Sequence, residues 1–124
     1  VIRTKMLHNE EGPIAELILS FVFDVVQGLE YLHAKGIIHG DLKPDNVLMK
    51  PDRTCLLGIV AKVTDFGLAA AISPTDTHVS NYKSGTPLYV APEVLTFARL
   101  TKASDIYALG VLMWEMVNTQ PLLV

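Results

Sequence analysis

Apolar residues recur at helical spacing between residues 15 and 34, and polar residues fill the positions between them. A helix with this spacing buries one face against a core. Pro13 suits the first turn, where its missing N–H costs no intrahelical bond, and Gly36 suits the helix end. The pattern predicts a helix over 15–34 whose apolar face consists of Leu17, Phe21, Val25, Leu29 and Leu32, broadened by Ile18, Val22 and Val26.

Residues 105–118 are apolar on nearly every side, which is typical of a helix inside a larger fold. Ser104 is the expected N-cap, because its hydroxyl can accept a hydrogen bond from the first turn. A shorter helix is expected over 91–97, where a proline stands near the start. We expect the long helix to be buried on most sides through Ile106, Leu109, Val111, Leu112, Met113, Trp114 and Met116.

Strands and loops are expected between the two long helices. Pro44 disfavours helical backbone at the preceding residue, so a short extended segment at 37–39 should lead into a loop at 40–45. Strands are predicted over 46–49 and 61–65, and we expect them to pair as a hairpin.

Two other segments show no steady period. Residues 67–90 are rich in Ser, Thr, Pro, Gly and Asn, and a long irregular segment of this kind is usually functional or disordered. Residues 1–12 are polar and mixed, and we expect them to hold the end of one element and then a loop that closes at "EEGP".

The size and composition suggest part of a larger fold. The 124 residues allow one domain at most, and half of them are apolar, which is high for a small soluble domain. The chain begins at Val1 and stops at Val124 after an apolar run, so both ends look cut. We therefore expect residues 1–124 to form a partial domain.

Charge and cysteine usage exclude several kinds of partner. A net charge of −3 offers no basic footprint for nucleic acid, so we expect no nucleic-acid partner. No signal peptide is evident, and the longest apolar stretch, around 106–117, is shorter than the roughly 20 residues of a bilayer span. The lone Cys55 is expected to be a small buried hydrophobe, which suits a reducing compartment. We expect no membrane segment in this chain and a cytoplasmic location, alone or as the cytoplasmic part of a membrane-anchored parent.

Four short patterns carry the candidate chemistry: "HGDLKPDN" at 39–46, "DFG" at 65–67, "APE" at 91–93 and "SDIYALGVLMWE" at 104–115. In this order they resemble the catalytic domain of eukaryotic protein kinases over nearly the whole chain. The resemblance implies an α+β fold, namely a mainly helical carboxy-terminal lobe with a small β-hairpin and no amino-terminal lobe. It also implies a catalytic loop at 39–46, an activation segment at 65–93 and a central helix at 104–118.

The resemblance assigns catalytic roles within the first pattern. Phosphoryl transfer to a hydroxyl group needs positioning and charge neutralisation more than covalent chemistry. Asp41 would orient the acceptor hydroxyl and take its proton, and Lys43 would steady the γ-phosphate. Thr86, in "GTPLYVAPE", would hydrogen-bond near both residues and position the protein substrate.

The resemblance also implies ATP and Mg²⁺ as cofactors. Mg²⁺ accepts hard oxygen ligands, and Asn46 and Asp65 would supply them from the two ends of the predicted hairpin. Lys43 and Leu48 would also contact the nucleotide, Leu48 at the adenine base.

Taken singly, these residues have plainer explanations. Asp41 could be a turn aspartate, and Asp65 could cap a turn before the glycine of "DFG". Turn chemistry does not explain why Lys43 and Asn46 accompany them.

Two further residues of the same loop receive structural roles. His39 follows two isoleucines, and we expect it to be buried, neutral and structural, as the corresponding histidine is in kinases. Asp45 is expected to be an exposed polar loop residue. In the resemblance, Asp105 would anchor the main chain around His39.

Position 40 departs from the family pattern, because glycine stands where kinases usually carry an arginine. That arginine pairs with a phosphate on the activation segment. We therefore expect activity that does not depend on such a phosphate, as in kinases that lack the arginine.

Lys43 and "GTPLYVAPE" suit a serine/threonine kinase, and "SDIYALGVLMWEM" is similar to its tyrosine-kinase-like branch. The glycine-rich loop and the strand lysine of the family do not occur, so the isolated chain is expected to be a poor kinase. The alternatives are a kinase-like, non-catalytic interaction module or an inactive fragment.

Overall fold

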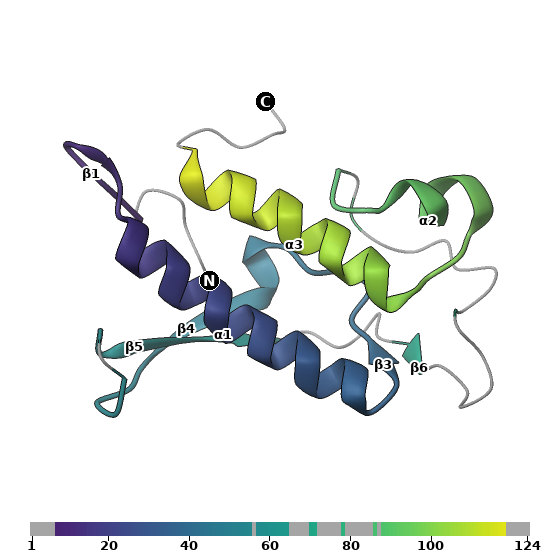
Figure 1. The fold of residues 1–124 in the computed structure, drawn as a ribbon, viewed down its shortest axis with the longest axis horizontal. Coiled ribbons are helices and arrows are strands. Elements are labelled where there is room, and N and C mark those ends of the chain that lie inside the picture. Colours follow the sequence, from purple (N-terminus) through teal and green to yellow (C-terminus); the bar gives the residue numbers. More distant parts are fainter. Residues whose placement is uncertain are drawn as a thin grey trace.

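The computed structural model describes residues 7–55, 57–64, 70–71, 78, 86 and 88–118. Over this part the fold is mixed α+β, with helices α1 (Ala15–Ala34), α2 (Pro92–Phe97) and α3 (Lys102–Val117). α1 and α3 run side by side, while the longest strands lie against α1 and α2 lies near the start of α3 (Figure 1). The mixture of three described helices and small antiparallel sheets agrees with the expected fold class.

The predicted hairpin is confirmed. β4 (Val47–Pro51) pairs antiparallel with β5 (Ile59–Val63), and Val47 stands opposite Val63. The strands lie within two residues of the predicted bounds. β4 begins and β5 ends beside the 39–46 loop, which includes one 3₁₀ turn at Pro44–Asn46.

Two smaller strand pairs were not predicted, although one of their strands lies in the segment that was expected to be extended, 37–39. β3 (Ile37–Ile38) pairs antiparallel with β6 (Ala70–Ala71), which lies inside the segment expected to be irregular. β1 (His8–Asn9) pairs with β2 (Gly12–Pro13) where a loop was expected. Each strand has two residues, too few to produce a visible alternation of apolar and polar positions.

α1 forms as predicted, with a correction at its start. Its buried side chains follow the expected stripe. Pro13, however, belongs to β2, where it pairs with His8 of β1, and the helix begins only at Ala15. At the other end, Gly36 has a φ of 72° and its N–H donates to the carbonyl of His33. A left-handed residue after the last turn is the usual helix stop, and glycine adopts it without steric cost.

The main core lies between α1, α3 and the β4–β5 hairpin. Gly28 lets β5 approach α1, because a Cβ built at this position would lie 3.2 Å from Val63 Cγ2. The buried members of the core are Leu7, Ile18, Phe21, Val25, Leu29, Leu42, Val47, Ala61, Ala108, Leu109, Leu112 and Met116.

The start of α3 differs from the prediction. The N-cap is Thr101, whose hydroxyl accepts a hydrogen bond from the N–H of Ser104, and the Ser104 hydroxyl accepts one from the N–H of Thr101. This reciprocal capping box satisfies two helix-end donors. Ser104 is therefore the third residue of the helix and not its cap.

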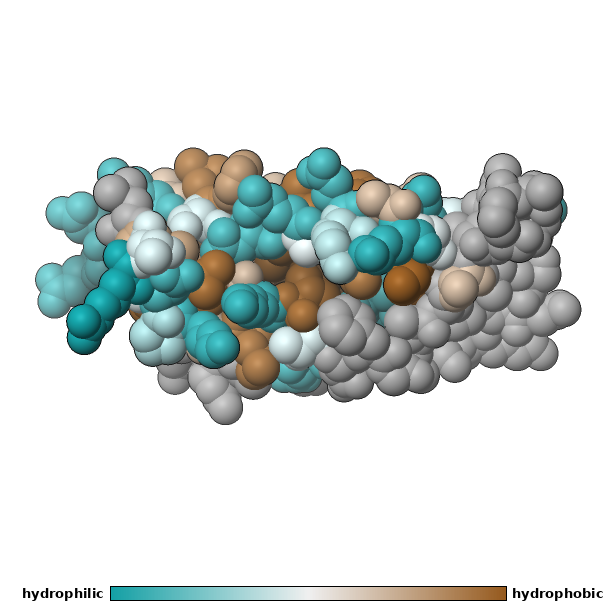
Figure 2. Space-filling view, turned by 90° about the horizontal axis from the view of Figure 1, so that it is seen from below, coloured by the Kyte–Doolittle hydropathy of each residue, from teal (hydrophilic) through white to brown (hydrophobic). Residues whose placement is uncertain are grey.

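The burial predicted for α3 is correct on one side only. Leu109, Leu112 and Met116 are buried, whereas Ile106, Met113 and Trp114 are 54%, 40% and 45% exposed. An apolar helix face is buried only where another element covers it, and no described element covers this one. Elsewhere, on the face shown in Figure 2, apolar atoms line a hollow between polar ones.

α1 is also long and apolar enough to cross a membrane, judged by length and composition alone. The sequence estimate had placed the longest apolar stretch in α3. Core helices of soluble proteins pass the same test, and the buried side chains of α1 belong to the core described above.

Cys55 differs from expectation as well. It is partly exposed, in the turn between β4 and β5, because the hairpin lies on the surface there.

Candidate active site

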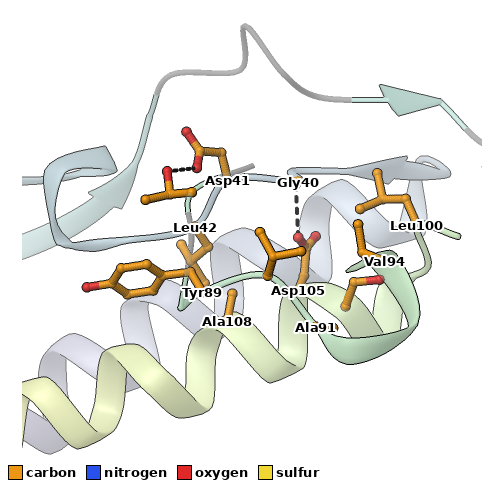
Figure 3. A pocket seen from close by; sticks show the side chains of 12 residues that line it. Gly40, Asp41, Leu42, Tyr89, Ala91, Val94, Leu100, Asp105 and Ala108 are labelled. Atoms are coloured by element: carbon orange, nitrogen blue, oxygen red, sulfur yellow. Dashed lines mark hydrogen bonds between the residues drawn. The ribbon is translucent and has the colours of Figure 1, made fainter. Parts of the chain in front are cut away.

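Asp105 of α3 holds the main chain of the 39–46 loop. Its carboxylate is 1% exposed and accepts hydrogen bonds from the N–H of His39 (2.8 Å, Oδ2) and of Gly40 (3.0 Å, Oδ1). Figure 3 shows Asp105 pointing from α3 towards Gly40. The predicted anchoring contact is therefore present, and it fixes the two residues before Asp41.

Gly40 has a φ of 84°, in the left-handed region that side chains with a Cβ rarely adopt. This backbone lets its N–H point at Asp105 while the chain turns into Asp41. Glycine thus has a conformational role here, which the resemblance to the kinase family did not suggest.

His39 is fully buried, as expected. Its Nδ1 accepts the N–H of Asp41 at 3.1 Å, so its Nε2 is the nitrogen that donates, to the carbonyl of Thr64 at 2.8 Å. An imidazole with one acceptor and one donor nitrogen is neutral. His39 therefore links the loop to the end of β5, and both nitrogens are used by the main chain.

Asp41, Thr86 and Lys43 form one hydrogen-bonded cluster. The Thr86 hydroxyl donates to Asp41 Oδ1 at 2.6 Å and accepts from Lys43 Nζ at 2.9 Å. Lys43 Nζ also lies 3.8 Å from Asp41 Oδ2. Figure 3 shows the Asp41 carboxylate pointing away from α3. Thr86 is 43 and 45 positions away in sequence, and the fold brings it to both residues as predicted.

Asn46 is buried and turned towards Asp41. Its Nδ2 donates to the carbonyl of Asp41 at 2.5 Å and lies 3.4 Å from Asp41 Oδ2. The side-chain nitrogen is therefore committed to the loop, which orients the amide. The Oδ1 atom is the kind of oxygen ligand that a hard cation would require.

The other predicted cation ligand, Asp65, lies outside the described residues. Its described neighbour Thr64 donates its N–H to the carbonyl of Asn46 at 2.7 Å, and its hydroxyl donates to the same oxygen at 3.2 Å. The end of β5 thus lies beside Asn46. Leu48, predicted at the adenine, is 47% exposed on β4.

Leu42 is fully buried beneath this cluster, whereas Asp45 is exposed as expected. The space between the loop, residues 89–91 and α3 measures only about 10 Å³, room for about one water molecule. The loop is therefore closely packed on the side that faces α3.

Tyr89 and Glu115 form a second polar contact below the loop. Burial of Tyr89 and its hydrogen bond to the Glu115 carboxylate raise the pKa of the phenol well above its ordinary value, with smaller charge effects of Glu115 and Asp45. Glu115 is itself buried. The phenol therefore stays neutral and ties residue 89 to α3.

One residue of this arrangement was missed in the sequence. His33, in the last turn of α1, lies with its Nε2 2.8 Å from Asp105 Oδ2. From the sequence of α1 alone, His33 could equally be a residue that only stabilises the end of its own helix. Its contact with Asp105 spans 72 positions and so leaves no local pattern.

Residues 3–124 match the sequence profile of the protein kinase domain. The chain belongs to the protein kinase domain family. It is 41% identical over 102 residues to the human 3-phosphoinositide-dependent protein kinase 1, covering 82% of this chain and 17% of that protein. It is 39% identical over 117 residues to the Arabidopsis thaliana serine/threonine-protein kinase TIO, covering 94% of this chain and 8% of the relative.

The matched part of this chain thus spans less than a fifth of either relative's length. Both relatives are protein kinases by name, and TIO is named as a serine/threonine kinase. Members of the family in general use ATP and Mg²⁺ and act on proteins.

Proposed function

We propose that this kinase chain forms the catalytic part of a serine/threonine protein kinase and corresponds to the carboxy-terminal lobe. The observation that carries the proposal is the cluster of Asp41, Thr86 and Lys43. An acceptor-only carboxylate beside a lysine and a threonine hydroxyl suits the transfer of a phosphoryl group to a small alcohol.

Asp41 is the proposed catalytic base. Its side chain is 11% exposed, so it remains accessible while Thr86 and Asn46 fix its direction. A substrate hydroxyl would take the place of the Thr86 hydroxyl at Oδ1 or share that oxygen. The carboxylate would then orient the hydroxyl and accept its proton.

Lys43 is the proposed γ-phosphate contact. It reaches Thr86 and approaches Asp41, so its charge lies where negative charge would develop during transfer. A fixed cation at that place stabilises the transition state more than the ground state.

Asn46 and Asp65 are the proposed Mg²⁺ ligands, with Leu48 beside the adenine. Asn46 fits the role, because its amide nitrogen donates a hydrogen bond to the loop and its amide oxygen is a hard ligand for a cation. Bound Mg–ATP would supply the phosphoryl group, and the chain would supply orientation and charge. Among the described residues there is no cluster of three or more His, Cys, Asp or Glu side chains that could hold a metal alone.

We also propose that the protein belongs with kinases that lack the loop arginine, in the tyrosine-kinase-like branch. The left-handed Gly40 supports the first part, because an arginine there would carry a strained backbone. Treating the active protein with phosphatase should leave its activity largely unchanged. A large loss would show that an activation-segment phosphate is needed after all.

The proposed activity can be tested with one matched pair of variants in the full-length protein that carries this chain. Asp41→Asn should lower phosphoryl transfer from ATP to serine or threonine by at least about 100-fold. Asp45→Asn, an equal change at an exposed neighbour, should leave it unchanged. Transfer that survives Asp41→Asn, or that yields only phosphotyrosine, would refute the proposal.

A further inference from the structure

The Asp105 carboxylate receives a third hydrogen bond, and it comes from outside the loop. His33 Nε2 lies 2.8 Å from Oδ2, the oxygen that also accepts the N–H of His39. Since an ionised carboxylate only accepts, His33 Nε2 must be the donor. One oxygen of Asp105 is thus shared between α1 and the loop.

His33 is poorly exposed, at 14%, and Asp105 is almost completely buried. A buried carboxylate needs well-directed donors, because each unmet lone pair costs free energy. His33 is the donor that comes from a rigid helix, whereas the other two are loop amides. It therefore restricts the rotation of the carboxylate that the loop amides bind.

The contacts continue from Asp105 to the base. Asp105 fixes the N–H groups of His39 and Gly40, and His39 Nδ1 accepts the N–H of Asp41. The same imidazole donates to the carbonyl of Thr64, next to the proposed cation ligand. A rotation of the Asp105 carboxylate would therefore displace the main chain on both sides of the site.

We propose that His33 is a positioning residue for phosphoryl transfer, acting through Asp105 on the loop that carries Asp41. The catalytic part of this role rests on the function proposed above. It assigns to α1 a part in the site, although the helix supplies no group that touches substrate. His33 also lines a cavity of about 460 Å³ between α1 and α3, with the charged groups Glu30 and Lys102 on its wall.

The chain offers matched variants for a test. His33→Leu keeps the approximate volume but cannot donate a hydrogen bond. His33→Gln retains an Nε2 that can donate to Asp105. His8→Leu removes another imidazole contact, the one between His8 Nε2 and the carbonyl of Met116 at 3.0 Å, at the opposite end of α1 (Figure 1).

The first measurement is amide hydrogen exchange, which needs no catalytic turnover. His33→Leu should lower the protection of the His39 and Gly40 amides about tenfold, as expected for one lost hydrogen bond to a charged group. The amide of the buried Val25 should keep its protection, and His33→Gln and His8→Leu should match the wild type. Unchanged loop protection in His33→Leu, an equal loss in His33→Gln, or an equal loss at Val25 would overturn the proposal.

The second measurement is steady-state kinetics of the full-length protein. His33→Leu should lower kcat about 10-fold to 100-fold with little change in the KM for ATP or peptide, because misplacement of the base affects the transition state. His33→Gln should recover most of the loss, and His8→Leu should show none. An unchanged kcat in His33→Leu would contradict the positioning role. A wild type without any transfer would instead contradict the proposed function, and the exchange measurement would still decide the role of His33.

Discussion

At the scale of single residues, Gly40 connects a backbone constraint with a functional expectation. The sequence shows only that an arginine is missing. The structure adds that the residue has a φ of 84° and donates its N–H to Asp105. A side chain here would strain the turn that leads into Asp41, so the glycine favours the observed loop.

Replacing this glycine should therefore cost stability. Gly40→Ala is expected to lower the free energy of unfolding by about 1 kcal/mol, because a Cβ is disfavoured at this φ. Urea denaturation at equilibrium measures it. A variant as stable as the wild type would mean that the left-handed turn is not required.

Tyr89 gives a pH prediction at the same scale. Burial and the bond to Glu115 raise the pKa of its phenol in the folded state. The unfolded chain ionises near the ordinary tyrosine value of about 10, so it loses the proton first as pH rises. The stabilisation is therefore complete below that pH and is lost above it.

Tyr89→Phe removes this contribution. The free energy of unfolding of the wild type should fall more steeply above about pH 10 than that of the variant. Below that pH the two curves should run parallel, with a constant offset from the lost hydrogen bond. Parallel curves through the alkaline range would contradict the raised pKa.

At the scale of elements, the helices and the hairpin could be predicted because their periodicity is long enough to see. The apolar stripe of α1 and the pairing of β4 with β5 follow from it. The pairing of the two-residue strands could not be predicted, since it depends on which segments the fold brings together, although extended backbone was expected at 37–39. The start of α3 was missed for another reason: Thr101 and Ser104 can both cap, and only the reciprocal pair of bonds shows which does.

Two helical glycines provide a contrast between propensity and packing. Gly110 on α3 has no atom within 4 Å of the place where a Cβ would stand, so Gly110→Ala should raise the free energy of unfolding by about 1 kcal/mol. Gly28→Ala gains the same propensity, but the new Cβ would stand 3.2 Å from Val63 Cγ2.

Gly28→Ala should therefore raise the free energy of unfolding less than Gly110→Ala does. Thermal or urea unfolding of the two variants measures the difference. If Gly28→Ala stabilised the protein as much as Gly110→Ala, the close contact between α1 and β5 would not be real.

At the scale of the whole molecule, the candidate site depends on contacts between distant segments. Sequence patterns indicated Asp41, Lys43, Asn46 and Thr86, and the fold brings these four together. They could be predicted because the motifs of a known family contain them. His33 could not, since its role arises from a contact across 72 positions between two helices.

The exposed face of α3 shows the same dependence on context. Its apolar composition led to an expectation of burial on most sides, which holds only for the side that faces the described core. Composition reports what a helix can pack against, and it does not report which partner is present.

We propose that four side chains converge on one Mg–nucleotide, namely Asp41, Lys43, Asn46 and Asp65. A structure of the full-length protein with Mg²⁺ and a non-hydrolysable ATP analogue tests this, and we expect the cation to be bound by Asn46 Oδ1 and the Asp65 carboxylate. We also expect the terminal phosphate within about 3 Å of Lys43 Nζ, on the same side of the loop as Asp41. A nucleotide bound elsewhere, or a residue 65 carboxylate directed away from Asn46, would contradict it.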